Sequence, residues 1–327
     1  MMDEALWETL YEKVLEGDIL NVLAYVFEYI AGDDLFFNGS LKKICISFLI
    51  LAVLAGIFSA FTESFGNQEV SKMGYFMIHI LLFSTLAGLF SEMLNIVKEV
   101  LNAILLVMNA AIPVYYVAVF SSGNNLSAST YYRVSVLVIY VVEQFVLHLM
   151  LPFVSCYMVL SFGNALWLEK KLSAVTELMK KAVNVVLKTM VGVISGISFL
   201  QSMVSPVIDG LKNETVQKTV SIIPGIGNAA EGMAELTVGS LILIKNSVGV
   251  CIFLILIITA AIPVVKLFVV SILLKGCGAL MAVITEKDFA KPVLETSEAV
   301  GILLKIVLTV LLLFVVSIAV VLFTTNG

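Results

Sequence analysis

Long apolar stretches separated by short polar segments form the main pattern of this chain. A helix rises about 1.5 Å per residue, so about 20 apolar residues cross the roughly 30 Å hydrocarbon core of a bilayer. Stretches of this length or longer occur at residues 44–62, 73–94, 100–120, 134–166, 185–204, within 221–266, at 267–284 and at 299–323. The pattern predicts an all-α fold, a polytopic integral membrane helical bundle with about seven to nine transmembrane helices.

The stretch 134–166 is too long for one simple crossing, because it would extend about 50 Å as a single helix. Pro152 lies within it, and proline removes a backbone donor from the helix interior. Either the stretch is one long kinked helix, or it is a crossing of about 18 residues followed by a shorter crossing or a re-entrant segment. Pro113, Pro224 and Pro263 are predicted helix breaks for the same reason.

Two segments combine an apolar side with a charged side. Residues 1–40 predict acidic amphipathic N-terminal helices, and residues 168–184 predict a basic amphipathic helix that lies in the membrane interface. The expected organisation is therefore N-terminal helices at 1–40, a first membrane bundle at 41–167, the interfacial helix at 168–184 and a second membrane bundle at 185–327.

Small residues recur in the segment 221–240. Gly225, Gly232 and Gly239 are seven residues apart and share one helical face, with Gly227 and Asn228 close by. A face with little bulk allows a second helix to pack closely, and we expect this segment to be broken or re-entrant. Gly192 and Gly196 form a GxxxG pair that predicts another close helix contact.

Ionisable and amide side chains within apolar stretches are the candidates for function, because polar groups in hydrocarbon must find protein or water partners. The candidates are Glu143, His148, Glu235, Lys245 and Asn246. His148 lies four residues after Gln144, which places both on one helical face. A structural hydrogen-bonded cluster and a path for a substrate or ion are both open interpretations of Glu143 and its neighbours.

The pentapeptide AAIPV occurs at 110–114 and again at 260–264. It indicates either an internal duplication or a coincidence in a chain rich in Ala, Ile and Val. If residues 134–166 cross the membrane once, the two copies run in opposite directions, as in inverted-repeat transporters. If they cross twice, the copies run in parallel.

Composition supports a membrane protein and excludes several other classes. The chain is 60% hydrophobic and 13% charged, with a mean hydropathy of +1.07, which is more apolar surface than one water-soluble core could bury. No basic run with interleaved aromatics occurs, so no nucleic-acid binding is expected. The four cysteines have no metal-ligand spacing, and no catalytic motif is present. We therefore expect no enzyme activity, cofactor or metal, and the first residues predict no signal peptide.

The segments SIIPGIGNAAEGMAELTVGSLILIKNSVGV and ITAAIPVVKLFVVSILLKGCGAL, together with the order of the earlier apolar stretches, resemble the stage III sporulation protein AE family. The resemblance implies a membrane component of the channel between mother cell and forespore, located in the mother-cell-derived outer forespore membrane. Its implied partners are membrane lipid and other stage III sporulation proteins, among them a secretion-type ATPase and ring-forming proteins of the intermembrane space, in a hetero-oligomer. No catalytic residues are implied.

Two other functions and the orientation stay open. A secondary transporter would use intramembrane ionisable residues such as Glu143, Glu235 and Lys245, and a membrane scaffold would conduct nothing. With a cytoplasmic N-terminus and a single crossing at 134–166, ten Lys and Arg residues lie on the cytoplasmic side of the membrane and six on the opposite side. The resemblance implies the opposite placement of the N-terminal region.

Overall fold

The structure is a computed structural model that describes residues 46–48, 50, 53–54, 56–57, 68–121, 125–166, 172–220, 227–284 and 287–324. Along 200–220 and 227–245 it describes the course of the helix only. The predictions for residues 1–40, Gly225 and Pro224 concern residues outside this part of the chain.

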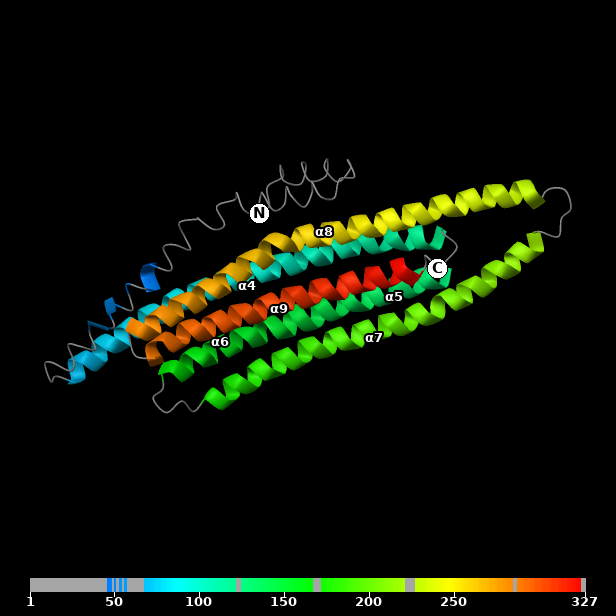
Figure 1. The fold of residues 1–327 in the computed structure, drawn as a ribbon. Helices are drawn as coiled ribbons and strands as arrows, with labels where there is room; N and C mark the ends of the chain where they lie inside the picture. The colour runs from blue at the N-terminus through cyan, green and yellow to red at the C-terminus, as the bar shows by residue number, and fades with distance from the viewer. Residues whose placement is uncertain are drawn as a thin grey trace.

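The described residues form long helices that run side by side in alternating directions (Figure 1). They are α4 (Gln68–Ser121), α5 (Asn125–Val141), the π-helix η1 (Val142–Met150), α6 (Leu151–Leu166), α7 (Ser173–Val220), α8 (Gly227–Ile284) and α9 (Lys287–Thr324). No strand occurs among them. The prediction of an all-α fold is confirmed for this part of the chain.

Helix α9 is the centre of the bundle. It packs against α8, α4, α7, α6 and α5, and in Figure 1 it runs between α4 and the α5–α6 run. Its apolar side chains are buried at helical spacing, with Leu303, Val307, Val310 and Phe314 fully inside. A helix with apolar residues on nearly every side is stable only where neighbours cover it from several directions, and α9 has such neighbours.

The helices are longer and fewer than predicted. The predicted spans 73–94 and 100–120 form one helix, α4, and α8 joins residues 227–240 to the later apolar stretches without a break. Four helices among the described residues are long and apolar enough to cross a membrane: Phe76–Ser121, Ala128–Asn164, Asn246–Ile284 and Phe289–Ala319. The count of seven to nine is not confirmed. Charged Glu92, Lys98 and Glu99 lie on the exposed side of α4, so they need not end it.

The predicted breaks at Pro113 and Pro263 are wrong, because α4 and α8 continue through both prolines. One lost backbone hydrogen bond does not end a helix that neighbours hold along its length. Pro152 has a different surrounding: it follows η1, in which the N–H of Leu151 donates to the carbonyl of Val146, five residues earlier. The run 125–166 is thus one helical course with a π-helical segment before the proline.

The two AAIPV copies lie on α4 and α8, which contact each other and run in opposite directions (Figure 1). Opposite directions are expected for the two copies when residues 134–166 form one continuous helical run.

Helix α7 continues through residues 184–185, where a boundary between an interfacial helix and a membrane span was expected. Its buried side chains recur every three or four residues and face α9, α5 and α6; they are Thr176, Met179, Val183, Leu187, Met190 and Ile194. The basic side chains are therefore held on a helix that is part of the bundle.

Candidate functional site: a charged belt and a polar groove

A belt of ionisable side chains surrounds the bundle about halfway along its length. We call it the charged belt; it consists of Glu92, Lys98, Glu99, Glu143, His148, Lys188, Lys266 and Lys305. Lys266 is half-buried, and the other members are exposed. Each of the α4, η1, α7, α8 and α9 segments contributes at least one of them.

Contacts between helices show that members of the charged belt lie at the same height along the bundle. Lys266 Nζ lies 3.4 Å from Glu92 Oε1 and joins α8 to α4. Lys305 Nζ donates to Asn184 Oδ1 at 3.2 Å and joins α9 to α7. At about 1.5 Å per residue, the other members lie within about 15 Å of Glu92 along the bundle.

On one side of the charged belt α4, α7, α8 and α9 carry no charge for about 20 residues each, or about 30 Å, whereas α5 carries none for the nine residues between Arg133 and Glu143, or about 14 Å. We call this the uncharged half; it comprises residues 100–121, 134–142, 189–208, 246–265 and 306–324, none of which is Asp, Glu, Lys or Arg. Arg133 and Lys245 follow at the far edge. Four tyrosines gather near that edge, where the ring centroids of Tyr115 and Tyr131 are 4.8 Å apart and those of Tyr116 and Tyr132 are 5.7 Å apart.

The other half of the bundle contains a cavity of about 520 Å³ between α6, α7 and α9, which we call the polar groove. It is lined by Tyr157, Asn164, Ser173, Thr176, Glu177, Lys180, Lys181, Asn184, Lys291, Leu294, Glu295 and Glu298. Three lysines and three carboxylates balance its charge. This half, residues 68–91, 151–166, 173–187, 267–284 and 287–304, is the grooved half.

Ion pairs occupy the polar groove. Lys180 pairs with Glu298 and joins α7 to α9, and Lys291 lies 3.7 Å from Glu295 within α9. Lys181 lies 2.8 Å from Glu177, and this hydrogen bond and the lysine charge lower the pKa of the Glu177 carboxyl. One oxygen of Glu295 is buried without a hydrogen-bond partner in the described structure. It can therefore accept a hydrogen bond from a bound molecule.

The predicted candidates Glu143 and His148 both lie on η1, on the outer surface of the bundle. His148 Nδ1 donates to the backbone carbonyl of Glu143 at 2.6 Å, and no bond joins His148 to Gln144. The π-helix explains the difference, because its geometry brings residues five apart together. The Glu143 carboxylate itself faces outward.

The other predicted candidates lie on α7 and α8. Gly192 and Gly196 are exposed, and a Cβ at either would meet nothing within 4 Å, so the close contact predicted there is not made among the described residues. The helical course of α8 includes Gly227, Asn228, Gly232, Glu235, Gly239 and Lys245, whose contacts the structure does not describe. Asn246 is half-buried, and its Oδ1 is buried without a described partner.

A close glycine contact occurs elsewhere, between α8 and α9. A Cβ at Gly278 would lie 2.6 Å from Leu294 Cδ2, whereas one at Gly276 would meet nothing within 4 Å. The feature of the sequence that indicates this close contact is the Gly-Cys-Gly run at 276–278. The Lys180–Glu298 pair had no such signal, because its residues are 118 positions apart.

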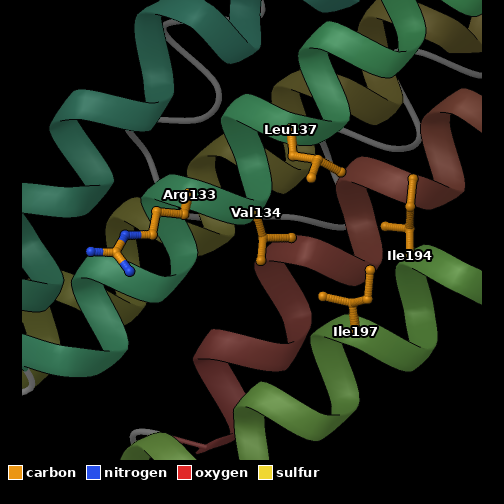
Figure 2. A pocket seen from close by; sticks show the side chains of 5 residues that line it. All are labelled: Arg133, Val134, Leu137, Ile194 and Ile197. Carbon is orange, nitrogen blue, oxygen red and sulfur yellow. The ribbon is translucent and has the colours of Figure 1, made fainter.

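Along the α5–η1 run and α7 lies an apolar groove. Figure 2 shows Val134 and Leu137 of α5 facing Ile194 and Ile197 of α7, while the guanidinium of Arg133 points away. This pocket of about 90 Å³ shares Leu137 and Ile194 with a larger one of about 580 Å³. The side chains offer contacts for hydrocarbon and no reactive group. No cluster of three or more His, Cys, Asp or Glu that could hold a metal occurs among the described residues.

Comparison with known proteins agrees with the resemblance noted in the sequence. The family model for stage III sporulation protein AE matches residues 9–325. The chain is 22% identical over 240 residues to stage III sporulation protein AE of Bacillus subtilis (strain 168), an alignment that covers 73% of this chain and 60% of that relative. No solved structure matches. With nearly its whole length matched by that family model, the chain belongs to the stage III sporulation protein AE family.

Proposed function

We propose that this sporulation protein is a non-enzymatic, integral membrane component of the channel complex between mother cell and forespore. The observation that carries the proposal is the family match over residues 9–325 in a chain whose helices α4, α7, α8 and α9 each have an uncharged stretch of about 30 Å on one side of the charged belt. A protein of this kind acts by spanning the membrane and binding other subunits, for which it needs no catalytic group.

The bilayer covers the uncharged half in this proposal. A charged side chain at the centre of a bilayer costs about 2.5–3.5 kcal/mol, and the grooved half exposes Lys275, Glu177 and Lys181. The uncharged half has no such cost. Tyrosines favour the membrane–water interface, and the tyrosine cluster lies with Arg133 at the far edge of the uncharged half, about 15 Å along the helix from Glu143 and about 30 Å from the level of Glu92.

The distribution of lysines and arginines supports an orientation. Of those on described helices, ten lie at the charged belt or in the grooved half: residues 72, 98, 180, 181, 188, 266, 275, 287, 291 and 305. Four lie beyond the uncharged half: residues 133, 212, 218 and 245. Cytoplasmic segments carry the excess of Lys and Arg, so the grooved half faces the cytoplasm, which is that of the mother cell if the protein lies in the outer forespore membrane.

This orientation suits the partners that the family implies. The grooved half is available to a cytoplasmic ATPase, and the opposite end of the bundle faces ring-forming proteins of the intermembrane space. Both contacts are part of the proposal.

Deletion of the gene in the spore-forming host tests the function. We expect normal engulfment, loss of late gene expression in the forespore and a large drop in heat-resistant spores. A tagged copy that restores sporulation should co-purify with other stage III sporulation proteins and locate to the outer forespore membrane. Normal spore counts in the deletion strain, or purification of the functional protein without any of these proteins, would contradict the proposal.

A secondary transporter is the alternative that one feature favours, namely the polar groove with Glu298, Lys180 and the unpaired oxygen of Glu295. Purified protein in liposomes should then move a solute in an ion-dependent way, and Glu298→Gln should abolish the movement. Glu99→Gln is the matched control, since that carboxylate is exposed on α4, outside the polar groove. Absence of transport in liposomes, with sporulation lost in the deletion strain, would leave the channel component as the function.

A further inference from the structure

The outer side of α4 carries a regular seam of exposed side chains. Its members alternate at spacings of three and four residues and are Glu92, Asn95, Glu99, Asn102, Leu106 and Asn109. Leu106 is 73% exposed. This spacing is the heptad pattern by which one helix packs along another that runs nearly parallel to it. We call this surface the asparagine seam.

The three asparagines of the seam have no partner within the described structure. All are exposed, and none of their side chains makes a hydrogen bond or other polar contact there. Asn102 and Asn109 lie about 5 Å and 15 Å beyond Glu99, inside the uncharged half. If the bilayer covers that half, as the proposed function states, these amides face hydrocarbon, where a polar group without a partner is strongly unfavourable.

We infer that the asparagine seam binds a second copy of this chain. Two copies inserted in the same direction are related by a two-fold axis along the membrane normal, so their α4 helices run parallel and equal positions meet. A carboxamide carries both donors and an acceptor, so Asn102 can pair with Asn102 of the second copy, and Asn109 likewise. Interhelical asparagine bonds of this kind drive helix association in membranes.

Charge at the charged belt fits the same arrangement. Lys98 and Glu99 are neighbours on the exposed side of α4, so a parallel second α4 brings Lys98 of each copy beside Glu99 of the other. Glu92 adds no repulsion, because Lys266 of its own chain neutralises it. The seam is therefore complementary to itself in its amides, and the two Lys98 side chains flank the Glu99 residues that meet at the two-fold axis.

Disulfide cross-linking in membranes tests the inference. The full chain, with its four cysteines replaced by serine, is expressed in a host that lacks other stage III sporulation proteins, and Asn102→Cys is oxidised. We expect a covalent dimer. Leu312→Cys is the matched control: it is 44% exposed at a similar level on α9, and it should stay monomeric. Absence of the Asn102→Cys dimer, or equal cross-linking of both variants, would overturn the inference.

A double substitution supplies the second measurement. Asn102→Ala with Asn109→Ala should weaken dimerisation by roughly tenfold or more while leaving the helical content unchanged. Dimers of unchanged strength would show that the asparagines do not form the contact. If Asn102→Cys is then expressed in the spore-forming host, cross-linking only to a different sporulation protein would overturn the inference and assign the seam to that protein. A different result, normal spore counts in the deletion strain, would contradict the proposed function, so the two failures can be distinguished.

Discussion

At the scale of single residues, the close contacts of this bundle depend on which side of a helix each residue occupies. Gly276 and Gly278 differ by two positions on α8, yet one faces open space and the other faces Leu294 of α9. The sequence places both in the same small-residue run and does not distinguish them. Their contrasting surroundings make them a matched pair for mutation.

We expect Gly278→Val to destabilise the protein by about 1–3 kcal/mol, because the added side chain overlaps Leu294 and forces α8 and α9 apart. Gly276→Val should change the free energy of unfolding by less than about 1 kcal/mol. Thermal unfolding in detergent, followed by circular dichroism, measures both. Equal stability of the two variants would mean that α8 and α9 do not pack closely at Gly278.

At the scale of helices, apolar runs predicted the elements well and their ends poorly. The runs at 73–94 and 100–120 are helical as predicted, but they form one helix where the pattern predicts two. Glu92, Lys98 and Glu99 occupy exposed positions on a continuous helix, and charge alone does not distinguish an exposed side from an end. The ion pair from Glu92 to Lys266 required the pairing of α4 with α8, which no local pattern specifies.

The glycines spaced by seven residues on α8 provide a prediction at this scale. Gly232 lies within the helix, where leucine has a higher helix propensity, so Gly232→Leu should not unfold the protein. If the small face binds another helix or subunit, the added bulk should reduce co-purification with other stage III sporulation proteins and lower spore counts. Gly276→Leu, at an exposed site of the same helix, should leave both unchanged.

At the scale of the whole molecule, the charged belt divides a bundle of long helices into two halves of different chemistry. Composition predicted a membrane protein, and the four long apolar helices agree with it. The belt could not be read from the sequence, because its members come from five segments and align only once the helices are side by side. The polar groove has the same origin, since Lys180 and Glu298 belong to different helices.

Accessibility of cysteine to a membrane-impermeant maleimide tests the placement of the bilayer. Leu294 and Leu312 are on α9, 36% and 44% exposed, on opposite sides of the charged belt. In the cysteine-free chain, Leu294→Cys should react from the cytoplasmic side, because it lines the polar groove, and Leu312→Cys should be protected. Protection of both positions would place the whole bundle in lipid, and the reverse pattern would exchange the two halves.

The central position of α9 has a consequence for biosynthesis. All the described helices that pack around α9 precede it in the chain, so they are synthesised before α9, their common neighbour. Until residues 287–324 arrive, buried faces of α4–α8 remain open to lipid, to insertion factors or to proteases. A nascent chain stalled before Lys287 should therefore be degraded quickly, because contacts between residues far apart in sequence form late.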